Sequence, residues 1–239
     1  MSSGDGWTRC AAGHRHWGLY GAAGLLLVDA DRVILQHRAP WTHEGDSWAV
    51  PGGARNSDED AVSAAVREAG EEAALTAEDV DPIGLYIDDH DGWAYTTVVG
   101  RATRQLQPVA ANAESVSVRW HQISEVAGLR LHTGFAAAWQ HLRDVPAPLY
   151  LLLHPDAARD PAAQALVRAG IASDRLPAAV HTGGLARLLP HPVPVTDQAE
   201  ANVAAEHYST LGQVIVATGS ADLALLTGPP ARGEQQAGR

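Results

Sequence analysis

The 239-residue chain contains no lysine, so all 17 of its basic residues are arginine. Its 28 acidic residues give a formal net charge of −11. Such a balance argues against non-specific binding to nucleic acid, which depends on neutralisation of phosphates by cationic side chains. An anionic small-molecule substrate would need local arginines and a metal ion to be held.

Cysteine and long apolar stretches are also scarce. Cys10 is the only cysteine, which excludes an intrachain disulfide and fits a reducing compartment. The longest apolar runs, such as residues 22–28, have the length of a strand and are far short of a membrane span. Residues 1–10 lack the basic start and apolar core of a signal peptide. We therefore expect a soluble, cytoplasmic protein with no membrane partner.

One segment combines glycine, arginine and several acids at fixed offsets. It begins at Gly53 and extends over residues 59–75. On a helix of 3.6 residues per turn, Glu68, Glu71 and Glu72 fall within an arc of about 100°. Carboxylates at such short separations repel one another, which destabilises the helix. A hard divalent cation bound by their oxygen atoms would turn this repulsion into attraction to the ion. A solvated acidic face, the usual explanation of a charge run, does not account for the preceding glycine pair or the arginine beside the first carboxylate.

The spacing Gly-x5-Glu-x7-Arg-Glu-U-x-Glu-Glu-x-Gly-U, with U apolar, is the Nudix box, and this chain resembles it closely. The matching positions are Gly53, Glu59, Arg67, Glu68, Glu71, Glu72 and Leu75. Ala74 stands where the family has glycine, and there it costs about 1 kcal/mol or moves the helix end by a residue. The resemblance implies an α/β fold, the Nudix α-β-α sandwich with a mixed sheet.

The resemblance also implies a reaction, the hydrolysis of a nucleoside diphosphate linked to another group, with Mg²⁺ or Mn²⁺ as cofactor. The expected metal ligands are Glu68, Glu71, Glu72 and the Gly53 carbonyl, because Mg²⁺ prefers oxygen ligands. Glu71 would share a second metal or accept a proton from the attacking water. Glu114 is the other candidate for the general base.

Other residues have expected supporting roles. Glu59 and Arg67 lie eight residues apart on nearly the same side of the helix, so we expect a structural ion pair, with Arg67 on substrate phosphate as the competing reading. Arg38 can grip a phosphate through two N–H groups. Trp93 and Tyr95 are candidates for stacking on a base, although core packing explains them equally well.

The box does not identify the substrate, because it holds the pyrophosphate and not the two ends of the molecule. Nucleoside triphosphates, including oxidised ones, ADP-ribose and nucleotide sugars all stay open. A Nudix-fold sensor that binds a nucleotide without cleaving it is the alternative from another class, and the intact acidic set argues against it. Homodimer formation is open as well.

Two prolines close together after Asp144 mark a predicted boundary between domains. We expect the Nudix domain over residues 15–144. Residues 149–227 alternate strands and helices, which predicts a small accessory domain with a parallel α/β layer. The tail, residues 228–239, is polar and rich in glycine and proline, so we expect it to be flexible.

The pattern of apolar residues predicts individual elements. Strands are expected at 19–28, 33–38, 48–50, 83–103 with a break at 88–92, 116–120, 149–153, 178–180, 193–195 and 213–216. Helices are expected at 59–73, 134–142, 161–169, 184–189 and 198–211. Ser57 or Asp58 is the expected N-cap of the first helix, whose inward face would carry Val62, Ala65, Val66, Ala69 and Ala73.

The second domain offers weaker signals. Residues 214–223 resemble, faintly, a segment of PIN-like nucleases, for which Asp156, Glu200 and Asp222 could supply acids, but Ser220 replaces an expected aspartate. A nuclease is therefore the lesser alternative. Residues 153–155 (Leu-His-Pro) lack the Arg-His-Gly start of histidine phosphatases, which disfavours that activity.

Near the N-terminus, Cys10, His14 and His16 resemble half of a zinc site. A closed structural zinc site needs four ligands. Three are present locally, so we expect these side chains to pack around Trp17 rather than bind a metal.

Overall fold

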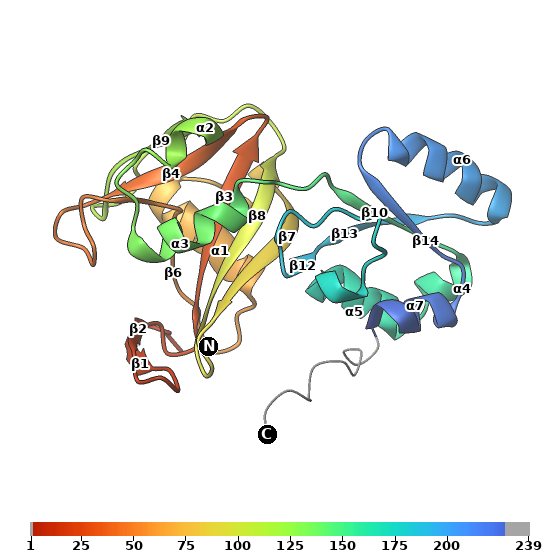
Figure 1. Ribbon diagram of the computed structural model, residues 1–239, viewed down its shortest axis with the longest axis horizontal. Coiled ribbons are helices and arrows are strands. Elements are labelled where there is room, and N and C mark those ends of the chain that lie inside the picture. Colours follow the sequence, from red (N-terminus) through yellow and green to blue (C-terminus); the bar gives the residue numbers. More distant parts are fainter. Residues whose placement is uncertain (1, 228–239) are drawn as a thin grey trace, which may run out of the picture. The chain divides into compact units, whose positions relative to one another are not determined.

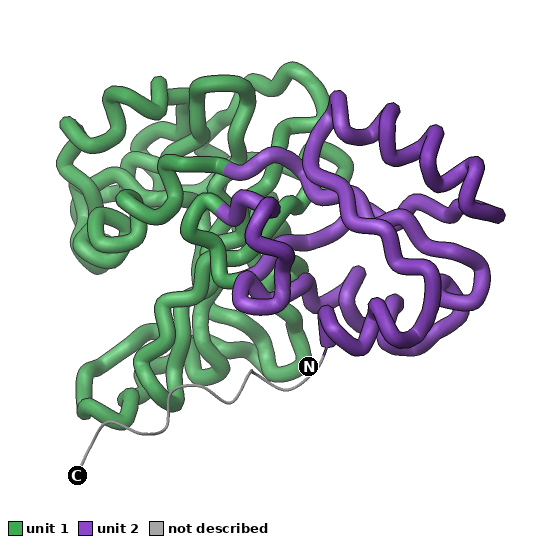
Figure 2. The backbone as a smooth tube through the Cα atoms, turned by 45° about the vertical axis from the view of Figure 1, so that its right-hand side comes forward, with its two compact units in different colours: residues 1–145, 183–186 green, residues 146–182, 187–239 purple. Residues whose placement is uncertain are grey.

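The computed structural model describes residues 2–227, which form two compact units (Figure 2). The first unit comprises the described residues up to Val145 together with Gly183–Ala186, and the second comprises the rest. The chain passes between the units at Val145, beside the predicted proline boundary, and the boundaries of the two domains stay a prediction. The predicted tail over 228–239 lies outside the described residues. None of the helices in residues 2–227 is long and apolar enough to cross a membrane.

The first unit is built on a mixed sheet, as predicted (Figure 1). Its strands follow the order β7-β8-β3-β4-β5, with β6 paired to β3 and β9 paired to β4. Their bounds are β3 Ala22–Asp29, β4 Arg32–Arg38, β5 Trp48–Ala49, β6 Gly52–Ala54, β7 Val80–Asp89, β8 Ala94–Ala102 and β9 Ser115–Gln122. Strands β3 and β8 run parallel, and the other pairs are antiparallel. The central strand β3 is buried on both faces, which explains its run of leucines.

Helices cover both faces of this sheet (Figure 1). Helix α1 (Ala61–Ala73) packs on β3 and β6, and α3 (Thr133–Leu142) packs on β7. The short helix α2 (Ile123–Val126) follows β9 directly. Alanines at 64, 65, 69 and 73 form the buried face of α1 together with Glu72. Small side chains allow the helix backbone to lie close to the sheet, which brings its acids near β6.

Helix α1 begins two residues later than predicted. Its N-cap is Asp60, whose carboxylate accepts the Ser63 N–H at 2.9 Å, so the predicted cap at Ser57 or Asp58 is wrong. Glu59 precedes the N-cap, and its carboxylate binds Arg67 of the helix. The predicted inward residues Val62 and Val66 are half-buried.

The C-terminal end of α1 retains the strain expected from the missing glycine. Ala74 has φ 54° and ψ 31°, the left-handed conformation, and its N–H donates to the Ala69 carbonyl. The helix end has therefore not moved to avoid this conformation. An L-residue with a Cβ is disfavoured there by about 1 kcal/mol relative to glycine.

We therefore expect Ala74→Gly to raise the melting temperature by about 2–4 °C. The matched control is Ala61→Gly, in the first turn of the same helix, which should lower it because glycine costs about 0.5–1 kcal/mol in a helix. Differential scanning calorimetry of the metal-free protein measures both. A melting temperature that falls in Ala74→Gly would contradict the assignment of strain to this residue.

Two hairpins lie together at one end of the first unit. Strands β1 (Trp7–Arg9) and β2 (Arg15–Trp17) pair in an antiparallel hairpin, which the sequence did not indicate. The Ala11 N–H donates to the Asp91 carbonyl at 2.8 Å, which joins the tip of this hairpin to the turn between β7 and β8.

The second unit contains the predicted parallel α/β layer. Its sheet has the order β13-β10-β14, and both pairs are parallel. The strands are β10 Leu149–Leu153, β13 Pro190–Pro194 and β14 Gln213–Ala217, and the helices are α4 Pro155–Ala158, α5 Pro161–Ala169, α6 Gln198–Ser209 and α7 Ser220–Thr227.

Two predicted elements in the C-terminal part are wrong. Residues 178–180 form a turn instead of a strand. The predicted helix at 184–189 is extended and contains β12 (Arg187–Leu188), which pairs with β11 (Ile171–Ala172). Leucines at 185, 188 and 189 have helical spacing, and all three are buried although the segment that carries them is not helical. The helical spacing was therefore the reason for the wrong prediction.

Candidate active site

The acids of the box divide into two buried side chains and one exposed side chain. On α1, the residue Glu72 is 3% exposed and the Glu68 side chain 14%, whereas the Glu71 side chain is 58% exposed. Helical spacing explains the division, because Glu68 and Glu72 are four residues apart and both lie towards β6. Two carboxylates are therefore held out of water beside the strand that precedes the helix.

Glu72 is fixed by the backbone of β6. Its Oε2 accepts the Gly52 N–H at 2.8 Å. Burial raises the pKa of Glu72 to about 7, although the Gly52 N–H and the Gln36 amide favour the charged form. Gln36 is itself fully buried on β4 and was not predicted from the sequence.

Glu68 lies directly over Gly53. A Cβ added at Gly53 would be 2.7 Å from the carboxyl carbon of Glu68 and from both of its oxygens. Any side chain at this position would displace the carboxylate, so close approach is the reason for glycine here. Burial also raises the pKa of Glu68, and Arg67 partly opposes that shift.

The backbone of β6 suggests a different carbonyl from the predicted one. Gly53 pairs with Ala23 on β3. Two residues further along in each direction, the pairs are hydrogen-bonded: the Arg55 N–H donates to the Gly21 carbonyl, and the Leu25 N–H donates to the Pro51 carbonyl. Because antiparallel pairs alternate, the polar groups of Gly53 face β3. Those of Gly52 face the opposite way, where its N–H meets Glu72. The predicted ligand, the Gly53 carbonyl, is thus directed into the sheet, and the Gly52 carbonyl is the better candidate.

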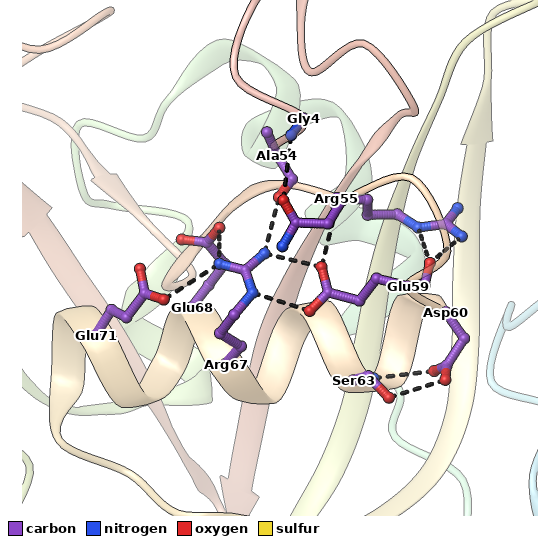
Figure 3. A network of polar contacts seen from close by, with 10 residues as sticks. Gly4, Ala54, Arg55, Glu59, Asp60, Ser63, Arg67, Glu68 and Glu71 are labelled. Atoms are coloured by element: carbon purple, nitrogen blue, oxygen red, sulfur yellow. Dashed lines mark hydrogen bonds and ion pairs between the residues drawn. The ribbon is translucent and has the colours of Figure 1, made fainter. Parts of the chain in front are cut away.

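Arg67 links the loop before the helix to the acids (Figure 3). Its Nε and Nη2 bind the two oxygens of Glu59 at 2.8 and 2.9 Å. Nη1 donates to Glu68 at 2.7 Å and to Glu71 at 3.3 Å, and Nη2 also donates to the Ala54 carbonyl at 2.9 Å. These bonds use all five N–H groups of the guanidinium. The competing reading of Arg67 as a phosphate ligand would require it to give up one of them.

The Glu59 carboxylate is correspondingly well satisfied. Its side chain is 8% exposed, and it accepts the Asn56 N–H at 3.1 Å in addition to both Arg67 bonds. The hydrogen bonds from Arg67 lower the pKa of Glu59 below its ordinary value. The geometry is that of a bidentate ion pair that fixes the loop against α1.

Arg38 and Tyr95 both lie near Glu72. The positive charge of Arg38 acts to lower the pKa of Glu72, while its Nε donates to the His43 carbonyl at 3.2 Å. The Tyr95 hydroxyl occupies the space beside Gly24 and Gly52, where added Cβ atoms would be 2.2 and 2.7 Å from it. Burial and the charge of Glu72 raise the pKa of Tyr95. Tyr95 therefore presents its hydroxyl to the acids, which differs from the predicted stacking on a base.

Trp93 is engaged elsewhere. Its Nε1 donates to the Gly18 carbonyl at 2.9 Å, and its ring stacks on His16 with centroids 4.1 Å apart and planes 14° apart. One face of the indole is thereby covered, which favours the packing interpretation over stacking on a base.

Glu114 lies in the loop before β9, and its side chain is exposed. Its carbonyl accepts the Ala39 N–H at 2.8 Å, and its N–H donates to Asn112 at 3.0 Å. The same loop is attached to α1, because the Ala111 N–H donates to the Glu72 carbonyl at 3.0 Å. The loop thus brings Glu114 to the end of α1 that carries the acids.

A hard divalent cation fits this set of side chains. Such ions prefer oxygen ligands. The site offers the buried carboxylates of Glu68 and Glu72, the exposed carboxylate of Glu71 and a backbone carbonyl of β6. Within residues 2–227, Arg67 is the guanidinium bound to Glu68 and Glu71, and Glu72 accepts a hydrogen bond from the neutral backbone of Gly52. Burial raises the pKa of both Glu68 and Glu72, and a cation bound beside them would favour their charged forms.

The acids considered for a nuclease do not form such a site. Asp222 accepts two bonds from Thr218, and Glu200 accepts two from Thr196, so each closes a local turn. Asp156 is 94% exposed. In residues 2–227, these three belong to neither group of side chains that has metal-ligand spacing.

Comparison with known proteins agrees with this geometry. The family model of the NUDIX domain matches residues 19–144. A Mycobacterium tuberculosis protein provisionally named 8-oxo-dGTP diphosphatase 3 is 46% identical over 159 residues, which cover 62% of this chain and 73% of that protein. A Bifidobacterium longum nucleoside triphosphate pyrophosphatase/Nudix hydrolase fusion protein is 41% identical over 145 residues, which are 57% of this chain and 30% of the fusion.

Among solved structures, the Nudix hydrolase RenU from M. smegmatis is 47% identical, with a TM-score of 0.55. The match covers 59% of this chain and 93% of RenU. With the box acids brought together on α1, these matches show that the chain belongs to the NUDIX domain family and is a hydrolase that acts on pyrophosphate bonds.

Proposed function

We propose that this protein hydrolyses the pyrophosphate bond of an oxidised purine nucleoside triphosphate, with 8-oxo-dGTP as the substrate to test first. The observation that carries the reaction is the meeting of Glu68, Glu72 and the Gly52 backbone beside the exposed Glu71. The choice of substrate is supported by the M. tuberculosis relative at 46% identity, whose provisional name is 8-oxo-dGTP diphosphatase 3.

Nudix hydrolases generally use divalent metal ions, and we propose Mg²⁺, with Mn²⁺ as a substitute. When bound, the ion would neutralise charge on the pyrophosphate, which otherwise repels an incoming nucleophile. Glu68, Glu72 and the Gly52 carbonyl would hold it, with Glu71 at the solvent side. Arg67 keeps Glu68 and Glu71 in place through its bonds to both.

The general base takes a proton from the attacking water, and we propose two carboxylates as candidates for this role. Glu71 is exposed on the acidic side of α1. Glu114 is exposed on a loop that is bonded to the end of the same helix. Both remain in the proposal, and the Arg38 guanidinium near Glu72 would attract the phosphates.

The test is product release by the purified protein with Mg²⁺ and then Mn²⁺. The panel contains 8-oxo-dGTP, dGTP, the other dNTPs, ADP-ribose, NADH, dinucleoside polyphosphates and nucleotide sugars, with Glu71→Gln as the control. We expect kcat/KM for 8-oxo-dGTP to exceed that for dGTP by at least about tenfold, because a site that pairs with the altered base edge rejects the unaltered base.

Three results distinguish the alternatives. A preference for ADP-ribose or a nucleotide sugar would keep the reaction and overturn the substrate. Unchanged turnover in Glu71→Gln would remove Glu71 from the mechanism and leave Glu114 to be tested in the same way. Failure to cleave every compound while still binding nucleotides would overturn the proposal in favour of a sensor.

A further inference from the structure

Four potential metal ligands meet at the end of the first unit, away from the box. Cys10 and His14 come from the tip between β1 and β2, His16 from β2, and His90 from the turn between β7 and β8. One ligand atom of each residue lies within 4.8 Å of those of the other three. The fourth residue, His90, is far along the sequence, which is why the first three were predicted to pack without a metal.

We propose that Cys10, His14, His16 and His90 bind one zinc ion in a structural site. Thiolate and imidazole are the ligands that zinc takes in tetrahedral sites, and a set of four protein ligands is closed to substrate. On binding, the Cys10 thiol loses its proton to solvent and bonds to zinc through sulfur.

The distances suit a small adjustment to tetrahedral geometry. Zinc bonds of about 2.0–2.3 Å to nitrogen and sulfur imply separations of about 3.3–3.8 Å between ligand atoms. The observed limit of 4.8 Å exceeds this by about 1.0–1.5 Å, which rotation of the side chains can close. The backbone of the tip is already fixed, because the Cys10 N–H bonds the His14 carbonyl at 3.2 Å and the Gly13 N–H bonds the Cys10 carbonyl at 2.9 Å.

Burial provides a second, independent observation. Cys10 is a free cysteine and is 5% exposed. The Nε2 of His16 is buried and has no hydrogen-bond partner among the described residues. A buried nitrogen without a partner is costly, and a metal ion in the cluster would satisfy it.

The surroundings orient the histidines. The Nε2 of His90 lies 3.2 Å from Oδ2 of Asp88, which leaves its Nδ1 for the metal. A carboxylate behind a ligating histidine fixes the ring and strengthens it as a ligand. His16 is held by stacking on Trp93, with ring centroids 4.1 Å apart. Asp88 is therefore a positioning residue of this site.

The site differs in chemistry from the acids on α1. Those acids are oxygen donors suited to Mg²⁺, whereas one sulfur and three nitrogens select a softer ion. Zinc here would add a further link between the tip of the first hairpin and the turn between β7 and β8, which are already joined by the Ala11–Asp91 hydrogen bond and by the contacts of Trp93. The expected role is therefore to hold the hairpin in place and stabilise the first unit.

Metal analysis of the full chain tests this directly. Protein expressed with added zinc and passed through a desalting column should retain one zinc per chain by mass spectrometry. Replacement by Co²⁺ should give the visible bands of tetrahedral cobalt and a near-ultraviolet band from thiolate to cobalt. A mercurial reagent that reacts with Cys10, the only thiol, should release one zinc for each thiol modified.

Variants separate the ligands from other sites. Cys10→Ser should remove the thiolate band, and His14→Ala, which changes an exposed residue and so should fold, should weaken zinc binding by at least about tenfold. Asp88→Asn should weaken it by about 10- to 100-fold. His43→Ala is the matched control, because His43 belongs to the other group with metal-ligand spacing, formed with Glu44 and His132.

Two outcomes would overturn the proposal. One is a wild-type protein that neither retains zinc nor gives the cobalt–thiolate band although it is folded by circular dichroism. The other is zinc that His14→Ala and Cys10→Ser retain as well as the wild type while His43→Ala loses it.

Discussion

Replacement of Glu72 by glutamine should lower kcat/KM by about a hundredfold or more while leaving the protein folded. Glutamine has the same shape and can still accept the Gly52 N–H, which lies 2.8 Å from Oε2. It lacks the negative charge that we assign to metal binding. Steady-state rates over a range of Mg²⁺ concentrations measure the effect, and Glu78→Gln, an exposed change of the same chemistry next to the helix, is the control.

The stability of this variant should move in the opposite direction from its activity. The folded pKa of Glu72 is raised to about 7, so at neutral pH the charged side chain favours the unfolded chain. A neutral glutamine removes that disadvantage, and the metal-free variant should melt at the wild-type temperature or above at pH 8. A lower melting temperature together with lower activity would mean that the residue acts on the fold, which contradicts the assigned role.

Replacement of Arg67 by methionine should destabilise the protein by about 2–3 kcal/mol. Removing one partner of a buried ion pair typically costs about 3–5 kcal/mol, and the value here is lower because the Arg67 side chain is 30% exposed. Glu59, at 8% exposure, would keep its charge with only the Asn56 N–H and the more distant charge of Arg55 to stabilise it. Chemical denaturation monitored by tryptophan fluorescence measures the change.

The effect of pH identifies the cause. The folded pKa of Glu59 is below its unfolded value, so its contribution to stability is complete above the unfolded pKa and is lost as the pH falls through the folded pKa. The difference between wild type and Arg67→Met should therefore shrink in acid. A double variant with Glu59→Gln should be less destabilised than the sum of the two single variants. Strict additivity, or a difference that is constant with pH, would contradict the ion-pair account.

The box was predictable because the helix period alone places its acids. Glu68 and Glu72, four residues apart, must lie on one side of any helix that contains both. The choice between Gly52 and Gly53 was not predictable, since it depends on which residue of β6 pairs with β3. The hydroxyl position of Tyr95 likewise depends on glycines at 24 and 52 that leave space for it.

Residues far apart in the sequence were the hardest to associate. His90 joins Cys10, His14 and His16 only because two hairpins meet, and no local spacing encodes that contact. In the C-terminal part of the chain, three buried leucines with helical spacing belong to a non-helical segment, because the pairing of β11 and β12 overrides the local pattern. The parallel layer itself was predictable, because strands and helices alternate along this part of the sequence.

The central claim is that the acids of α1 hold a divalent cation, and electron paramagnetic resonance of Mn²⁺ measures this without any substrate. Titration of wild-type protein should remove free Mn²⁺ signal, and added Mg²⁺ should restore it. The double variant Glu68→Gln/Glu72→Gln should leave the signal free at the same concentrations, while Cys10→Ser should bind as wild type because Mn²⁺ prefers oxygen ligands. Equal binding by the wild type and the double variant would contradict the account.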